Sequence, residues 1–215
     1  MQLSLRDITR LLSVSEGIVR RWIREDGMPA ERVEGQIRFN RARLLEWATA
    51  RRIKLPADFF GAPAGGVAEA LRRGGVHLGL EAADKAAALK ALVEATPLPV
   101  DRGNLLSILM AREAMASTGV GDGIAIPHAR NPVVLNVEKP AVALGFLAQP
   151  IEFGALDGKP VHTLFLLISP TVQAHLQLLS RLAFVLGNDA FRKALALRAP
   201  EAILDAAART EAELK

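Results

Sequence analysis

Apolar residues in the first sixty positions follow the period of short helices and then that of a β-hairpin. Helical spacing occurs twice, in two groups of residues: Ile8, Leu11 and Leu12, and then Val19, Trp22 and Ile23. Residues 31–39 alternate apolar and polar side chains around a central Glu-Gly pair, and this alternation predicts a small hairpin. A further helix is expected from Asn40 to about Ile53, with three residues facing inward: Leu44, Trp47 and Ala48.

Polar residues mark the start of the first two helices. Ser4 and Ser15 are suited to accept a hydrogen bond from a backbone amide one turn later, and Asp7 favours the positive end of the first helix dipole. Ser13 and Val14 form a tight turn between the two helices. Helix, tight turn, helix, hairpin and helix is the order of a winged helix-turn-helix domain, which we expect over residues 1–54.

The pattern changes after a stretch rich in proline, glycine and alanine at 55–66, which we interpret as a linker. Helices are expected near 67–72, 83–95, 101–116, 173–187 and 189–208, and strands at 76–80, 124–126, 141–148 and 161–169. Helices that alternate with apolar strands predict an α/β sandwich over 67–215, with a mixed β-sheet flanked by helices. The fold class of the whole chain is therefore expected to be α+β.

Positive charge is concentrated in the first quarter of the chain. Residues 1–60 hold 12 Lys and Arg against 8 Asp and Glu, a difference of +4, whereas residues 61–215 hold 15 of each. This asymmetry indicates a polyanionic partner for the first domain, and DNA fits its expected fold. The candidate DNA-binding residues lie on the second helix and the hairpin: Arg20, Arg21, Arg24, Arg32 and Arg38. The alternative is a small helical protein-interaction module whose arginines form a solvated face.

Several classes of protein and site are excluded by composition. The chain has no cysteine, so disulfides, thiolate nucleophiles and cysteine-ligated zinc are absent. No apolar run is long enough to span a bilayer, and the first residues lack a signal-peptide pattern. We therefore expect a cytoplasmic protein without membrane insertion.

The most informative stretch runs from Arg112 to His128. It begins at the end of an amphipathic helix and continues as a loop with glycine at 119, 121 and 123. The apolar strand 124–126 follows, and His128 lies just beyond that strand. Alternating glycines permit positive φ and close backbone approach. We expect His128 to be exposed and held by a rigid scaffold, which is a suitable position for chemistry.

Other readings of these residues are less favoured. The glycine run precedes a strand instead of linking a strand to a helix, so it is no dinucleotide fingerprint. His128 and His175 lack a third ligand at a recognisable spacing, so no metal and no cofactor is indicated. A lone histidine after a strand is commonly structural; His77 is expected to be so, and His162 has no assigned role.

Three motifs carry a resemblance to a known family. They are Ser117-Thr-Gly-x-Gly-x-Gly-Ile-Ala-Ile-Pro-His128, then Ile151 to Val161, and then His175 to Ala183. In this order they resemble the fructose/mannitol and nitrogen-regulatory class of enzyme IIA domains of the bacterial phosphoenolpyruvate-dependent phosphotransferase system. The first fifty residues resemble excisionase-like and MerR-like winged DNA-binding domains.

The resemblance implies roles for individual residues. His128 would carry a phosphoryl group from an HPr-like phosphocarrier, and His175 would be the second active-site histidine. Arg112 matches the family's basic residue, whose guanidinium would neutralise phosphoryl charge. Ser117 and Thr118 would bind phosphate or orient the ring.

The two halves together suggest a phosphotransferase-type phosphoryl carrier whose phosphorylation regulates DNA binding. A homodimer on two DNA half-sites is the expected form, because a single small domain binds weakly. Two alternatives stay open: an enzyme IIA component that passes phosphate to a sugar permease IIB, and a transcription factor whose second domain is an unphosphorylated sensor.

Overall fold

The chain divides into two compact units, Met1–Ala62 and Pro63–Lys215. The computed structural model describes residues 2–33, 35–40, 43–44, 47–48, 51, 53, 65–129 and 137–214. Apart from Gly65 and Gly66, the expected linker 55–66 lies outside the described residues.

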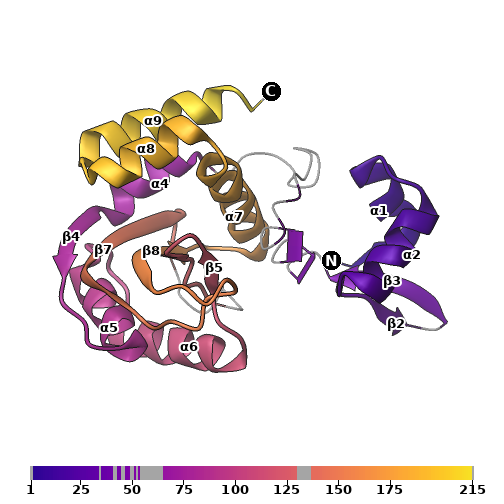
Figure 1. Cartoon of the computed structure of the whole chain (residues 1–215), viewed down its shortest axis with the longest axis horizontal. Coiled ribbons are helices and arrows are strands. Elements are labelled where there is room, and N and C mark those ends of the chain that lie inside the picture. The colour runs from indigo at the N-terminus through magenta and orange to yellow at the C-terminus, as the bar shows by residue number, and fades with distance from the viewer. Residues whose placement is uncertain are drawn as a thin grey trace. The chain divides into compact units, whose positions relative to one another are not determined.

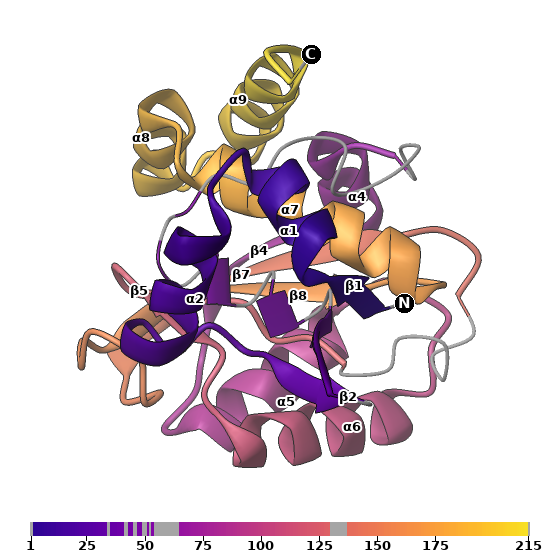
Figure 2. The same cartoon turned by 90° about the vertical axis from the view of Figure 1, so that its right-hand side faces the viewer.

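The first unit contains the predicted helix-turn-helix and hairpin (Figure 2). Its elements are β1 (Gln2–Ser4), α1 (Leu5–Leu12), α2 (Glu16–Glu25), β2 (Glu31–Val33) and β3 (Gln36–Asn40). The strands form an antiparallel sheet in the order β1-β3-β2. The expected helix 40–53 is described only in part, and in that part Leu44, Trp47 and Ala48 are buried as predicted.

Local hydrogen bonds account for the ends of both helices. Ser4 and Asp7 form a reciprocal capping box at the start of α1, and the Ser15 hydroxyl accepts from the Ile18 amide at the start of α2. Ser13 closes α1 in the left-handed conformation, with φ of 52°. The predicted N-caps and the predicted turn are therefore confirmed.

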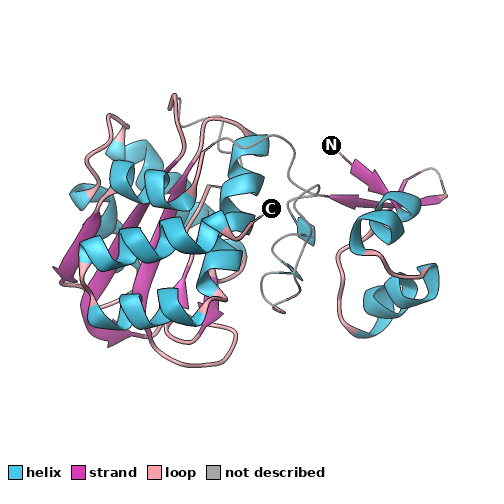
Figure 3. Cartoon of the chain, turned by 90° about the horizontal axis from the view of Figure 1, so that it is seen from above, coloured by secondary structure: helices cyan, strands magenta, loops and turns pink. Residues whose placement is uncertain are grey.

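The second unit is built on a five-stranded mixed sheet (Figure 3). Its strands are β4 (Val76–Leu80), β5 (Gly119–Gly121), β6 (Ile124–Ala125), β7 (Ala141–Ile151) and β8 (Val161–Ile168). They lie in the order β4-β7-β8-β6-β5, in which β4 pairs parallel with β7 and β6 pairs parallel with β8. The other two neighbouring pairs are antiparallel.

Helices cover both faces of this sheet. They are α4 (Val67–Gly74), α5 (Lys85–Ala95), α6 (Arg102–Met115), α7 (Val172–Leu186), α8 (Asp189–Leu197) and α9 (Pro200–Ala212). Figure 1 shows α5 and α6 on one side of the strands and the other four helices on the opposite side. The expected α/β sandwich is thus confirmed, and none of the described helices is both long and apolar enough to cross a membrane.

Apolar side chains alternate between the two faces of the strands. Leu89 and Leu92 of α5 and Leu105 of α6 pack in one core with residues such as Leu164 and Leu166 of β8. On the other face, α4 approaches β7 at Gly74, where an added Cβ would lie 2.2 Å from the Val142 carbonyl oxygen. Burial of this apolar area is the main favourable contribution to folding of the unit.

Two expectations about the elements need correction. The helix expected over 189–208 is two helices, because Arg198 takes the left-handed conformation (φ 52°) and Pro200 begins α9. The expected glycine loop is instead a hairpin: β5 pairs antiparallel with β6 around a turn in which Asp122 and Gly123 have φ of 52° and 73°.

Candidate functional site

The backbone that carries His128 is held by strands on two sides. The Ile126 amide donates to the Thr118 carbonyl oxygen at 3.0 Å, and the Leu167 amide of β8 donates to the Pro127 carbonyl oxygen at 2.9 Å. His128 itself forms a parallel bridge with Leu167. The residue is therefore part of the sheet's hydrogen-bonding pattern, although it follows the end of β6.

A hydrogen bond indicates which ring nitrogen of His128 carries the proton. The ring Nδ1 lies 2.8 Å from the Ile126 carbonyl oxygen. A carbonyl oxygen can only accept, so Nδ1 must carry the proton of this bond. In a neutral imidazole the lone pair then lies on Nε2.

The second predicted histidine lies beside the first. His175 is in the first turn of α7, whose N-cap is Thr171, and its ring centroid lies 5.2 Å from that of His128 with 39° between the ring planes. The two residues are 47 positions apart in the sequence, and the packing of α7 over β8 brings them together.

The expectation that His128 is exposed is wrong. His128 is 4% exposed and His175 is 5% exposed. The reason is the setting of both residues, because His128 follows a buried strand beside β8 and His175 lies on the buried side of α7. A polar pair at this depth is removed from most of the competing water.

Arg112 and Ser117 lie at the turn that leads from α6 to β5. The guanidinium Nη1 of Arg112 donates to the Ala116 carbonyl oxygen at 2.8 Å, close to the C-terminus of α6. The Ser117 hydroxyl donates to the Phe153 carbonyl oxygen at 2.8 Å and accepts from the Gly119 amide at 3.1 Å. Both side chains therefore shape the entry to the β5–β6 hairpin.

Thr118 is bound to a buried carboxylate that the sequence reasoning missed. Its amide lies 3.0 and 3.1 Å from the two oxygens of Glu113, and its hydroxyl donates to Glu113 Oε2 at 2.7 Å. Lys85 Nζ lies 3.2 Å from Glu113 Oε1. A signal was present in the sequence, because a carboxylate in the last turn of a helix opposes the helix dipole and needs a compensating partner.

The two remaining histidines make other contacts. His77 Nε2 lies 3.0 Å from the Gly74 carbonyl oxygen, near the start of β4. His162 Nδ1 lies 2.8 Å from the Thr163 hydroxyl, and burial, together with the nearby charge of Arg198, lowers the pKa of His162. In the part of the chain that the structure describes, no three His, Asp or Glu side chains are grouped as a metal site.

The candidate DNA-binding arginines differ in the partners they have. Arg20 is paired with Glu16 at 2.9 Å and 2.6 Å, whereas Arg21 and Arg24 are exposed on the same helix. On the hairpin, Arg32 of β2 is exposed and Arg38 of β3 donates to Gln36 at 2.7 Å. The helix and the hairpin thus both present guanidinium groups at the surface of the first unit.

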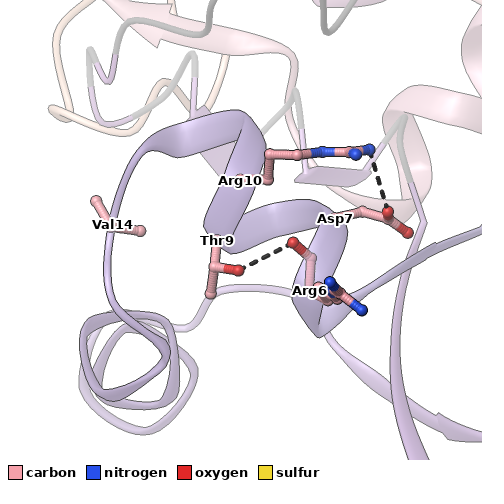
Figure 4. A pocket seen from close by; sticks show the side chains of 5 residues that line it. All are labelled: Arg6, Asp7, Thr9, Arg10 and Val14. Carbon is pink, nitrogen blue, oxygen red and sulfur yellow. Dashed lines mark hydrogen bonds and ion pairs between the residues drawn. The ribbon is translucent and has the colours of Figure 1, made fainter.

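A pocket on α1 adds two arginines that the sequence reasoning did not select. Figure 4 shows its lining of Arg6, Asp7, Thr9, Arg10 and Val14. Arg10 lies 3.6 Å from Asp7, and the Thr9 hydroxyl donates to the Arg6 carbonyl oxygen at 2.9 Å. Positive charge in the first unit therefore extends to its first helix.

Comparison with known proteins separates the chain at the same place as the fold does. The family model described as "Phosphoenolpyruvate-dependent sugar phosphotransferase system, EIIA 2" matches residues 69–208. A model described as "Helix-turn-helix domain" matches residues 3–52.

The individual relatives match less than half of the chain. The fructose-specific EIIA component of Haloferax volcanii is 42% identical over 97 residues, which are 44% of this chain and 61% of that protein. The nitrogen regulatory protein of Pseudomonas aeruginosa is 40% identical over 97 residues, with the same two shares. The chain thus spans less than two thirds of the length of these curated relatives.

Solved structures agree with the fold. The nitrogen regulatory protein IIA-Ntr of Neisseria meningitidis superposes with a TM-score of 0.52 at 29% identity, over 64% of this chain and 98% of that one. This neighbour is covered almost completely, so the second unit is similar to a whole domain of this type.

Proposed function

Since the chain belongs to the EIIA 2 family of the phosphoenolpyruvate-dependent sugar phosphotransferase system and carries a helix-turn-helix domain, we propose that it is a regulator phosphorylated on His128. The phosphoryl donor is an HPr-like phosphocarrier, and phosphorylation modulates DNA binding by the first unit. The observation that carries the proposal is the hydrogen bond from His128 Nδ1 to the Ile126 carbonyl oxygen, beside the ring of His175.

The geometry supports transfer to Nε2. The Nε2 lone pair of His128 attacks the donor's phosphorus, the donor's P–N bond breaks, and its electron pair returns to the donor imidazole. The His128 ring gains positive charge as the new bond forms, so the hydrogen bond from Nδ1 to the Ile126 carbonyl strengthens along the reaction. An interaction that strengthens toward the transition state lowers the barrier.

The neighbouring side chains have separate roles in this proposal. His175 lies close enough to bind a phosphoryl oxygen or fix the ring of His128. Arg112 supplies the positive charge that the loose transition state requires. Ser117 and Thr118 orient the hairpin, because both hydroxyl groups already donate within the protein.

Burial of the two rings favours storage of the phosphoryl group. At 4% and 5% exposure the site excludes most water, which is the competing phosphoryl acceptor. The donor must place its phosphorus in line with Nε2 of the buried ring.

The DNA-binding half of the proposal assigns the domains as residues 1–54, a linker at 55–66 and residues 67–215. Arg20, Arg21 and Arg24 contact bases or adjacent phosphates, and Arg32 and Arg38 contact phosphates. A homodimer on two half-sites provides the binding area that one small domain lacks. Phosphorylation of His128 adds negative charge to a unit that is close to neutral, and this change alters dimerisation or domain docking.

A labelling experiment tests the phosphorylation. The purified chain is incubated with labelled phosphoenolpyruvate, enzyme I and HPr, and acid-labile, base-stable label is measured. We expect label on the wild type and on His77→Ala, the control at a histidine outside the site, and none on His128→Ala. Label that persists in His128→Ala would overturn the assignment.

A binding experiment tests the regulation. A DNA site is first selected with the wild-type chain, and its affinity is then measured for wild type and His128→Ala, each with and without the phosphorylation cascade. We expect only the wild type to change its affinity when the cascade is added. Equal affinities in all four conditions would remove the regulatory switch.

A second candidate function is supported by the names of relatives. The Haloferax volcanii relative is a fructose-specific EIIA component. In this alternative, the chain passes phosphate to a permease IIB. If that is the function here, label on His128 will move to a purified IIB protein and DNA affinity will be unaffected. Retention of label by the chain together with a change in DNA affinity favours the regulator.

A further inference from the structure

We propose that Glu113 is a positioning residue that holds the nucleophilic tautomer of His128 through Thr118 and Ile126. This inference rests on the proposed phosphorylation of His128 and adds to it a residue outside the reacting pair. Glu113 belongs to α6, lies fifteen positions before His128 and is 7% exposed.

The contacts form a continuous series from the carboxylate to the ring. Glu113 accepts from both the amide and the hydroxyl of Thr118. The Thr118 carbonyl oxygen accepts from the Ile126 amide at 3.0 Å. The Ile126 carbonyl oxygen then accepts from His128 Nδ1 at 2.8 Å.

The series acts through the positions of its atoms. The amide and the carbonyl of Thr118 belong to two different peptide groups, as do those of Ile126, so polarisation is not passed along one conjugated group. Glu113 fixes Thr118, which lies where α6 turns toward β5. Thr118 in turn fixes the position of the Ile126 backbone through the hydrogen bond between them. The direction of the Ile126 carbonyl decides whether it meets Nδ1 in line. Loss of that alignment would release the Nδ1 proton to move to Nε2, the nitrogen that must stay unprotonated.

The environment of Glu113 explains why a charged group is retained at this depth. Lys85 Nζ lies 3.2 Å from Glu113 Oε1 and 4.8 Å from the centre of the buried Phe153 ring. The carboxylate thus has a cation and two donors from Thr118, which compensates for its removal from water. Removal of the carboxylate would leave the Thr118 amide and hydroxyl and the Lys85 ammonium without this acceptor, so Glu113 holds Thr118 in place.

The step from placement to rate follows from the geometry of phosphoryl transfer. The Nε2 lone pair must point in line at the donor phosphorus, and a misplacement of about 1 Å costs up to roughly a hundredfold in rate. A weakened Nδ1 bond both tilts the ring and lowers the share of the reactive tautomer. Binding of the phosphocarrier, which involves its surface and not this buried series, is unaffected.

Nitrogen NMR of the His128 ring and single-turnover labelling test this inference on the full chain. The variants are Glu113→Gln and Thr118→Val, which are close in size to the native residues, and Glu94→Gln is the control on an exposed ion pair of α5. We expect both test variants to lose Nδ1-protonated tautomer and to slow phosphoryl uptake by roughly tenfold at saturating HPr, with an unchanged KM for HPr. Glu94→Gln should match the wild type in both measurements.

Two outcomes would overturn the role of Glu113. One is a wild-type tautomer share in a folded Glu113→Gln protein. The other is a rate loss that only follows the fraction of unfolded chain. The tautomer is measured without phosphorylation, so it still decides the role of Glu113 if the wild type takes no label, a result that would instead refute the proposed function.

Discussion

Glu211 Oε1 accepts a 2.6 Å hydrogen bond from the backbone amide of Val67, a residue 144 positions earlier in the chain. Its Oε2 accepts from the Ala68 amide at 3.1 Å, so one carboxylate of α9 caps the first turn of α4. Arg181 of α7 lies 3.3 Å from the same carboxylate. An anion at a helix N-terminus meets unpaired amides and the positive end of the dipole, so this contact joins three helices.

We predict that Glu211→Gln destabilises the second unit by about 1–2 kcal/mol, because charged acceptors make stronger hydrogen bonds than neutral ones. Denaturant unfolding of the full chain, followed by helical circular dichroism, measures the loss. Glu213→Gln, two residues further on an exposed position, is the control. Equal stability of the two variants would show that the capping contact contributes nothing.

Gly123 is a position where two separate effects oppose a side chain. It has φ of 73°, and an added Cβ would lie 2.3 Å from His162 Nε2. Gly158 has a similar φ of 67° with no atom within 4 Å of an added Cβ. Gly158→Ala therefore measures backbone strain alone, of about 1 kcal/mol, and Gly123→Ala should cost more. Thermal unfolding is measured for both single variants and for the double variant Gly123→Ala with His162→Ala. The double variant lacks the His162 ring, so it separates the clash with that ring from the backbone strain of positive φ.

His162 makes the stability of the second unit depend on pH in a definite direction. Burial is the main reason why its folded-state pKa is below the ordinary value of 6.5, so the unfolded chain binds the proton more tightly. The contribution of neutral His162 to the free energy of unfolding is complete above pH 6.5. It is lost as pH falls through that value toward the folded-state pKa. We predict that the stability of wild type relative to His162→Gln declines between pH 7 and pH 5. A difference independent of pH would contradict the depressed pKa.

The capping box of α1 makes the stability of the first unit depend on pH in a more acidic range. Hydrogen bonds from the Ser4 side chain and backbone hold the pKa of Asp7 below its usual 3.8. The stabilisation is therefore present above that value and is lost as pH falls below it. Ser4→Ala should cost about 1 kcal/mol at pH 7. Acid titration of the unfolding free energy should show a smaller decline for Asp7→Asn than for the wild type.

The pairing of the α2 arginines predicts unequal effects on DNA binding. Arg20 is already partly neutralised by Glu16, whereas Arg21 is exposed on the same helix. If both face phosphates, Arg21→Gln should reduce the slope of log affinity against log salt by about 0.9, and Arg20→Gln should reduce it by less. Affinity for one DNA duplex at several salt concentrations gives both slopes. Equal reductions would show that Glu16 releases Arg20 on binding.

Much of the fold follows from local patterns in the sequence. Ser4 and Ser15 predicted the starts of α1 and α2, because a short polar side chain just before an apolar stripe can accept a hydrogen bond from an amide of the first helical turn. Alternation around Gly35 predicted the β2–β3 hairpin. The short strand β5 escaped prediction, since Gly119-Val-Gly121 has little strand propensity and pairs only because β6 lies beside it.

The proximity of the two candidate histidines was predictable from the sequence, and the surroundings of these residues were less so. The motif ending in His128 and the later helix at His175 indicated a pair, and the structure brings the two rings together. Burial of both residues could not be derived from their neighbours in the sequence, because it depends on the packing of α7 over β8. The position of Glu113 in the last turn of α6 was a signal that it needs partners, but the sequence did not indicate that these partners are Lys85 and Thr118.

The parallel pairing of β6 with β8 continues as far as His128 without a slip. Ile124 is opposite Thr163, Ala125 is opposite Leu164, and four residues after Ile124 His128 is opposite Leu167. Side chains alternate between sheet faces, so one inserted or deleted residue between Ile124 and His128 would turn the imidazole toward the α5–α6 side. The number of residues from Ile124 to His128 is therefore fixed. Any insertion that this protein tolerates must lie before the β5–β6 hairpin or after His128.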